Sequence, residues 1–345
     1  MVVNVETYIL GIESTSHTFG VGVVSSSDKG IRILANVNER YVPSKGGIHP
    51  REAAIHHSKN AVQTIMKALG EAGLRIDDLS GVAVALGPGL GPCIRVGASI
   101  ARFLSSYYGK PLIPVNHAIA HVEIGKFINN FTDPVVVYVS GGNTLVAVQK
   151  ARRYRIIGET LDIPLGNLFD TFVREIGLAP PYVEGGLHKI DICAEWAPGF
   201  TPLPYTVKGC DLSFSGLLTA ALKLARKYGD DRGKLGNICF SLRETAFNML
   251  IEVSERTLAL FRKKELLLVG GVASNKKLIE KFELLSNAYG VRFGYVPPEY
   301  AGDNGAMIAY TGLLMYKYGL TVKPEEAYVK QRWRIDEVEL PWLTI

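Results

Sequence analysis

The chain has 345 residues, of which 47% are hydrophobic and 21% charged, and its formal net charge is +5. This composition excludes wholesale disorder, and the length predicts two domains rather than a single core. The uncharged stretches are too short for a transmembrane helix and no secretion signal opens the chain, so we expect a cytoplasmic protein with no membrane contact. The four cysteines form no CxxC pair, which favours reduced thiols over a zinc site or a disulfide framework.

Two hairpins of similar design are predicted far apart in the chain. The first covers residues 8–27 around a Ser/Thr/His turn and ends its first strand at Glu13. The second covers residues 134–150 around the turn 140–144. The repetition indicates an internal duplication, and we expect the N–H groups of both turns to face a common cleft, where stacked N–H groups bind anions.

The other elements alternate between strands and helices. We predict strands over 81–86 and 266–269, and helices over 51–70, 95–108, 244–261, 275–285 and 304–316. The loop GPGLGP at 87–92 is followed by no Lys-Ser/Thr pair, so it predicts a tight strand–helix connection and not a Walker motif. The segment 179–205 contains five prolines and predicts an irregular excursion with a short helix around 188–196. The alternation favours an α/β fold.

His117 and His121 are candidates for metal ligands. Their i, i+4 spacing places both imidazoles on one face of a helix, which the preceding Pro-Val-Asn can cap. Asp303, before the predicted helix 304–316, is the candidate oxygen ligand; a role as the N-cap of that helix is its alternative. Tyr138 is a weaker candidate. Ala118 stands where HExxH metalloproteases carry a glutamate base, and this disfavours peptide hydrolysis.

Glycine turns and basic clusters suggest binding to phosphate groups. Gly141 and Gly142 permit positive φ and close approach of backbone amides to phosphate, although an ordinary hairpin turn also accounts for them. The turn at Gly270 precedes a helix and is similarly ambiguous. The basic residues in 150–155 and 262–264 could contact an RNA backbone, although scattered solvated lysines would give a similar net charge.

Nine segments, in order through residues 11–312, together resemble the universal tRNA threonylcarbamoyladenosine synthase family, once described as O-sialoglycoprotein endopeptidases. They are GIESTSHTFGVGVV, GGIHPREAA, GPGLGPCIRVGASIA, NHAIAHVE, YVSGGNT, GETLDIPLGNLFDTFVREIGL, DLSFSGLLTAA, GGVASNKKL and YAGDNGAMIAYTG. The tyrosine of YVSGG resembles the archaeal and eukaryotic cytosolic branch. The resemblance implies a two-lobed actin-like ATPase (ASKHA) fold with duplicated ribonuclease H-like domains. The lobes would be 1–130 with 308–345, and 131–307.

The resemblance also implies an activity and its residues. A threonylcarbamoyl group would move from threonylcarbamoyl-AMP to N6 of the adenosine beside the anticodon in tRNAs reading ANN codons. One divalent metal ion, Fe²⁺ first and Zn²⁺ second, would be held by His117, His121 and Asp303, with Tyr138 as a fourth candidate ligand. Glu13 and His17 would be catalytic residues of the first hairpin. Bound ATP or threonylcarbamoyl-AMP would contact Tyr138, Val139, Ser140, Gly141, Gly142, Asp170, Gly185, Gly186, Asp191 and Asn275.

One departure affects this assignment. Where the family usually has GGPKxE, this chain has GGLHKID, so Asp191 replaces the glutamate after a one-residue insertion, and Gly185 and Gly186 remain alternatives. The implied partners are tRNA, a small atypical protein kinase and small accessory subunits of the KEOPS assembly, and a separate synthase that makes the adenylate. The alternative function is a metal-dependent ATPase or ATP-binding scaffold of the same superfold. Two histidines disfavour it, because phosphotransferases hold Mg²⁺ with carboxylates and water.

Overall fold

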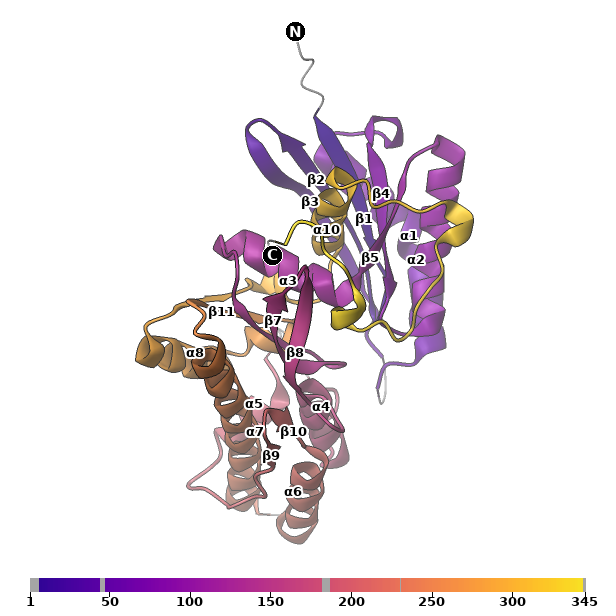
Figure 1. Ribbon diagram of the computed structural model, residues 1–345. Coiled ribbons are helices and arrows are strands. Elements are labelled where there is room, and N and C mark those ends of the chain that lie inside the picture. Colours follow the sequence, from indigo (N-terminus) through magenta and orange to yellow (C-terminus); the bar gives the residue numbers. More distant parts are fainter. Residues whose placement is uncertain (1–5, 44–46, 182–186, 230, 344–345) are drawn as a thin grey trace. The chain divides into compact units, whose positions relative to one another are not determined.

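The computed structural model describes residues 6–43, 47–181, 187–229 and 231–343, which form two compact units (Figure 1). The first unit comprises Met1–Ile128, Lys150–Tyr154 and Gly302–Ile345, and the second comprises Asn129–Gln149 and Arg155–Ala301. Residues 302–307 thus belong to the first unit, whereas the family resemblance implied that they belong to the second lobe. They include the start of a helix, from Gly305, that packs on the first strands of the chain.

The first unit is a five-stranded sheet covered by helices on both faces. Its strands, in the order β3-β2-β1-β4-β5, are β1 (Thr7–Glu13), β2 (Thr18–Ser27), β3 (Gly30–Arg40), β4 (Gly81–Gly87) and β5 (Leu112–Asn116). The strand β1 pairs antiparallel with β2 and parallel with β4. Helices α1 (Pro50–Ala72) and α2 (Gly91–Tyr108) share one apolar core with the sheet, and α3 (His117–Asn129) and α10 (Gly305–Lys317) share the other. Short 3₁₀ turns are η1 (Ile76–Asp78), η3 (Pro324–Glu326) and η4 (Ile335–Glu337).

The second unit repeats this strand order. Its sheet, β12-β11-β6-β7-β8, contains β6 (Val135–Val139), β7 (Thr144–Lys150), β8 (Arg153–Glu159), β11 (Glu265–Val269) and β12 (Arg292–Tyr295). A two-stranded sheet adds β9 (Val207–Lys208) and β10 (Asp211–Leu212). The helical elements are α4 (Leu165–Glu175), α5 (Lys189–Ala194), α6 (Ser215–Tyr228), α7 (Arg232–Phe261), η2 (Gly271–Ser274), α8 (Lys276–Tyr289) and α9 (Pro298–Ala301).

If the five strands of each sheet are numbered by their order in the chain, both sheets have the spatial order 3-2-1-4-5, the second one when it is read from β8 to β12. This shared order is the topology of a duplicated α/β unit. The two predicted hairpins are confirmed as the antiparallel pairs β1–β2 and β6–β7. None of the helices in the described part of the chain combines the length and apolar character that crossing a bilayer requires.

Helix α7 begins twelve residues earlier than the predicted start at residue 244, at Arg232. Asp231 caps it by accepting a hydrogen bond from the Lys234 N–H (3.0 Å). Glycines weaken the helical pattern of this first part, but Gly236 is required by packing, because a Cβ there would lie 2.5 Å from the carbonyl carbon of Trp196.

The expectation of four reduced thiols is wrong at two positions. Cys193 on α5 and Cys239 on α7 form a disulfide, with Cα atoms 5.7 Å apart, whereas Cys93 and Cys210 are free. The bonded residues are 46 positions apart and meet because α5 packs along α7. No local spacing of cysteines signals such a pair.

Candidate metal centre and nucleotide-binding residues

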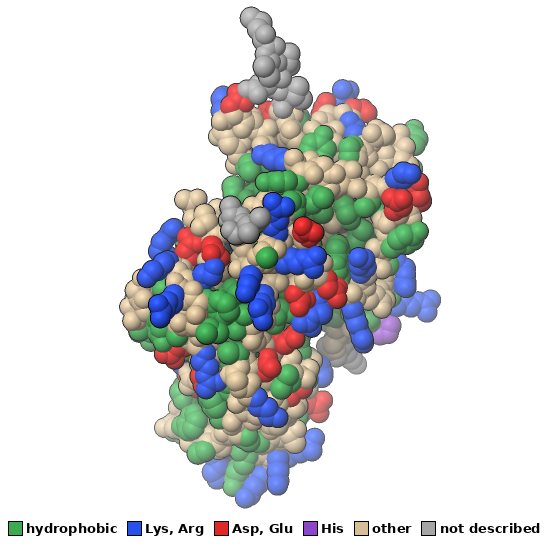
Figure 2. All heavy atoms as spheres, in the orientation of Figure 1, with side chains coloured by type: hydrophobic (Ala, Val, Ile, Leu, Met, Phe, Trp, Pro, Cys, Tyr) green, Lys and Arg blue, Asp and Glu red, His purple; other side chains and the backbone are tan. Residues whose placement is uncertain are grey.

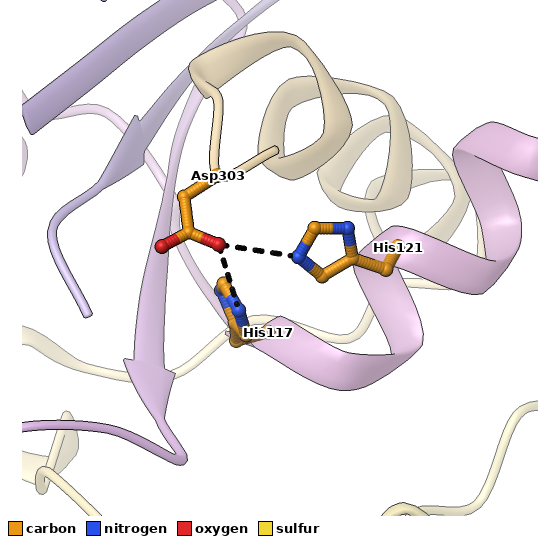
Figure 3. Close-up of side chains that lie close together, drawn as sticks. All are labelled: His117, His121 and Asp303. Atoms are coloured by element: carbon orange, nitrogen blue, oxygen red, sulfur yellow. Dashed lines mark hydrogen bonds and ion pairs between the residues drawn. The ribbon is translucent and has the colours of Figure 1, made fainter. Parts of the chain in front are cut away.

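Three candidate ligands converge within the first unit (Figure 3). His117 opens α3, His121 follows one turn later, and Asp303 precedes α10. The Nε2 atoms of both histidines lie 3.4 Å from the same Asp303 oxygen, Oδ1. The three ligand atoms lie within 4.8 Å of one another. Two bonds of about 2.1 Å that meet at a tetrahedral angle span about 3.4 Å, so the spacing of each histidine nitrogen from the aspartate oxygen fits a transition-metal ion.

The start of α3 is fixed by a side-chain cap. Asn116 Oδ1 accepts hydrogen bonds from the N–H groups of Ala118 (2.9 Å) and Ile119 (3.1 Å). This confirms the cap predicted from Pro-Val-Asn. It holds the first turn of α3, and therefore His117, at the end of β5.

Glu13 lies behind His117 and not in the ligand set itself. Its Oε2 atom is 2.8 Å from His117 Nδ1, and its Oε1 atom accepts the Thr15 N–H at 2.5 Å. A carboxylate at Nδ1 fixes the orientation of the ring and leaves Nε2 directed at Asp303. Both oxygens of Glu13 are thus engaged in holding the site. His17 lies on the same hairpin, and its electrostatic interaction with Asp303 also lowers the pKa of that carboxyl.

Asp303 is positioned by the N-terminus of α10. The N-cap is Asn304, whose side chain accepts the Met307 N–H at 3.0 Å, so the alternative role of Asp303 as the cap is wrong. Asn38 and Asn36 of β3 accept further N–H groups from this first turn.

Glycines let α10 lie directly on the strands. A Cβ on Gly22 would be 2.3 Å from the Ala306 nitrogen, and one on Gly11 would be 2.1 Å from the Ala309 nitrogen. Any larger residue at these two positions would push the helix away from the sheet. The position of Asp303 thus depends on small residues near the start of the chain.

The charges of the site are strongly coupled. Burial opposes a charge on His117, but the carboxylates of Glu13 and Asp303 outweigh it and raise its pKa to about 9. Burial lowers the pKa of His121. Burial also opposes the charge on Asp303, yet the neighbouring histidines hold its pKa well below the usual range. Without a metal ion, a proton on His117 offsets one of the two carboxylate charges, and a metal ion that binds at Nε2 must displace the proton there.

Candidate nucleotide-binding residues gather in the second unit. Asp191 on α5 accepts a hydrogen bond from the amide of Asn275, the N-cap of α8, at 2.8 Å. Asp170 on α4 pairs with His188 Nε2 at 3.0 Å. The Ile190 N–H donates to His188 Nδ1, so the proton that the ring donates to Asp170 is the one on Nε2. Gly185 and Gly186 lie outside the described residues.

The SGG turn follows β6, whose last residues are Tyr138 and Val139. Glycine permits positive φ at Gly141 and Gly142, but neither of these two described residues adopts it. The N–H groups of Gly142 and Asn143 donate to Ser140 Oγ instead. A phosphate group on this turn would therefore compete with the serine hydroxyl. The role of Tyr138 as a fourth metal ligand stays a prediction.

Two contributors were missed from the sequence. Arg243 on α7 is buried and places Nη1 3.1 Å from Asp191 Oδ1, on the carboxylate that also contacts Asn275. His188 belongs to the GGLHKID segment, but its contact with Asp170 was not predicted. An arginine in the middle of a long helix carries no signal of its partner, which comes from another helix 52 residues away in sequence.

The family model and the similar proteins that match this chain carry the same name. The family model described as tRNA N6-adenosine threonylcarbamoyltransferase matches residues 32–310. A protein of that name from Staphylothermus marinus is 66% identical over 97% of this chain and 99% of its own length. One from Ignicoccus hospitalis is 55% identical over 97% and 100%.

Two solved structures share the fold at low sequence identity. HypF of T. kodakarensis aligns with a TM-score of 0.63 at 13% identity, covering 94% of this chain and 49% of HypF. Component A of the Acidaminococcus fermentans (R)-2-hydroxyglutaryl-CoA dehydratase aligns with a TM-score of 0.50 at 14% identity, covering 88% of this chain and 97% of that protein. Both likenesses fit the two-lobed actin-like fold that the family resemblance implied.

Proposed function

Because the chain belongs to the tRNA N6-adenosine threonylcarbamoyltransferase family, and is thereby an acyltransferase that modifies tRNA, we propose the following reaction for it. The N6 amine of the adenosine beside the anticodon attacks the carbamoyl carbon of threonylcarbamoyl-AMP. The bond from that carbon to the phosphate oxygen breaks, and AMP leaves with the electron pair. The N6 proton passes to a base, for which we propose His17, on the hairpin that carries Glu13.

The convergence of His117, His121 and Asp303 carries the proposal. An exocyclic adenine amine is a weak nucleophile, so transfer needs an activated donor held in a defined orientation. A bound Fe²⁺ or Zn²⁺ ion would polarise the donor carbonyl and stabilise negative charge on the departing phosphate. The three side chains would hold that ion, and Glu13 would keep the His117 ring turned toward it.

We propose that the second unit binds the nucleotide. Three helices supply its polar groups: the carboxylates of Asp170 on α4 and Asp191 on α5, and the amide of Asn275 at the N-cap of α8. This set of donors and acceptors suits ribose hydroxyls and an adenine edge. The SGG turn would contact the phosphate. No covalent enzyme intermediate is needed, so we propose direct transfer.

We further propose that the chain works in the cytoplasm, where tRNA is modified, as the catalytic subunit of a KEOPS-type assembly with a small kinase and accessory subunits. A separate synthase would supply threonylcarbamoyl-AMP. The family resemblance supports these partners.

The test combines the full-length chain, prepared threonylcarbamoyl-AMP and a transcript of an ANN-decoding tRNA, and quantifies the modified nucleoside by mass spectrometry. We expect product with the wild type and loss of both metal and product in Asp303→Ala. A tRNA with guanosine in place of the target adenosine is the matched control. Product formation by metal-free Asp303→Ala at the wild-type rate would refute the role of the metal. A radiolabelled threonylcarbamoyl–protein adduct that survives denaturation would refute direct transfer.

A further inference from the structure

The corner where α6 ends and α7 begins carries a dense group of cations on the surface of the second unit. Residues 215–235 contain five basic residues and two acidic ones. The five are exposed and are Lys223, Arg226 and Lys227 of α6 and Arg232 and Lys234 of α7, here called the α6–α7 basic corner. Figure 2 shows Lys and Arg side chains gathered at the lower end of the view, where Figure 1 places α6.

The cations of this corner border an open hollow and two aromatic rings. Thr219, Leu222, Lys223, Arg226 and Lys227 line the hollow. The ammonium groups of Lys227 and Lys234 both lie 4.9 Å from the centre of the Tyr228 ring. The guanidinium of Arg232 lies 4.4 Å from the centre of the Trp196 ring. Both rings are half-buried, so cation and ring surface are presented together.

Helix stability accounts for only part of this charge pattern. Arg226 and Lys227 occupy the last turn of α6, where positive charge favours the helix dipole. Arg232 and Lys234 occupy the first turn of α7, where the same dipole disfavours positive charge. The Asp231 carboxylate lies 3.5 Å from Lys234, which offsets one of the two. Three of the five cations, Lys223, Arg226 and Lys227, line one hollow, where an external polyanion could contact them together.

We propose that the α6–α7 basic corner is a contact surface for the phosphodiester backbone and an unstacked base of tRNA. This proposal rests on the proposed function, which makes tRNA the substrate. Lysine and arginine neutralise phosphates, while aromatic rings and guanidinium planes stack on exposed bases of RNA loops. The corner offers both. The sequence did not reveal it, because the five cations are spread over twelve positions and two helices, unlike the compact clusters at 150–155 and 262–264.

The test uses the full-length chain with Lys223, Arg226 and Lys227 all changed to glutamate. The matched control reverses Lys29, Lys59 and Lys67, three exposed lysines of the first unit, and so makes the same change in net charge. Binding of a fluorescent tRNA transcript is measured from low to high salt, and binding of AMP reports on the fold and the nucleotide site.

We expect the corner variant to bind tRNA at least tenfold more weakly than the control variant at about 0.1 M salt. We expect the slope of log affinity against log salt to become shallower by about two, since each lost phosphate contact removes about 0.7–0.9. AMP binding should be equal in all three proteins. A corner variant with the affinity and salt slope of the control would overturn the proposal.

Two further measurements distinguish an RNA-binding surface from a general anion-binding surface and from failure of the proposed reaction. Polyglutamate and an unrelated RNA of equal charge are compared as competitors that displace tRNA from the wild type. If polyglutamate displaces tRNA as effectively as the unrelated RNA does, the corner is a general anion-binding surface, and the assignment to RNA is overturned. Threonylcarbamoyl transfer by the wild type is measured separately. Failure of that reaction contradicts the proposed function, whereas normal transfer with unchanged tRNA binding by the corner variant contradicts only this surface.

Discussion

Replacing Glu13 by glutamine tests whether the metal centre depends on the carboxylate behind His117. The two carboxylate oxygens of Glu13 serve different partners: Oε2 faces His117 Nδ1 at 2.8 Å and Oε1 accepts the Thr15 N–H at 2.5 Å. Glutamine has one oxygen and one NH₂ group, so in one of these two contacts the NH₂ group would face another N–H donor and the hydrogen bond would be lost. The ring of His117 then loses either its partner or its orientation.

Loss of such a supporting partner typically lowers metal affinity about 10- to 100-fold. We expect that range for Glu13→Gln, measured by titrating the metal-free protein with Zn²⁺ or Fe²⁺ in competition with a chelator of known affinity. Glu280→Gln makes the same chemical change on the exposed surface of α8 and should bind metal like the wild type. Unaltered metal affinity in Glu13→Gln, with the fold intact by circular dichroism, would refute the reasoning.

Three further predictions concern the supports of the two sites. Gly22→Ala should lower stability by about 1–3 kcal/mol and weaken metal binding, because the new methyl group meets the backbone of α10. Gly70→Ala, where the added Cβ meets open space, is the control, and equal unfolding midpoints for the two variants would contradict the packing argument. Arg243→Met should destabilise the protein by about 3–5 kcal/mol in urea unfolding, since it leaves Asp191 buried without its cation. Arg243→Lys should recover part of the loss, and a Met variant as stable as the wild type would show that the pair is dispensable. Because the pKa of His117 is raised in the folded state, its protonation stabilises the metal-free protein. This contribution is complete below about pH 6.5 and is lost as the pH rises through about 9. The wild type should therefore lose roughly 3 kcal/mol relative to His117→Gln between pH 6 and 10; parallel pH profiles of the two proteins would contradict it.

Local patterns explain what the sequence could predict. The i, i+4 spacing of His117 and His121 sets their shared face whatever the rest of the fold does, and Asn116 caps the same helix from the adjacent residue. The hairpins and the strand–helix alternation are likewise local, so the fold class followed from them. Recognition of the family motifs supplied the proposed roles of Asp170, Asp191 and Asn275.

Partners brought together by packing could not be predicted in the same way. Arg243 and Cys239 lie on one face of α7 and meet Asp191 and Cys193 of α5, a helix of only six residues. So short a helix has little stability of its own, and these contacts, not its propensity, hold Asp191 in place. A sequence pattern describes neighbours along one element, whereas here the decisive contact joins two.

The same distinction applies to the metal centre. His121 and Asp303 are 182 positions apart, and they meet only after α10 has packed on β1 and β2 through Gly11 and Gly22. The ligand set therefore exists in the folded first unit and is dispersed in the unfolded chain. A metal ion that binds the assembled set favours the folded state by mass action, in proportion to the logarithm of its concentration over its dissociation constant. Metal affinity and the stability of the first unit are thus linked through the same glycine contacts, and a substitution that loosens α10 weakens both.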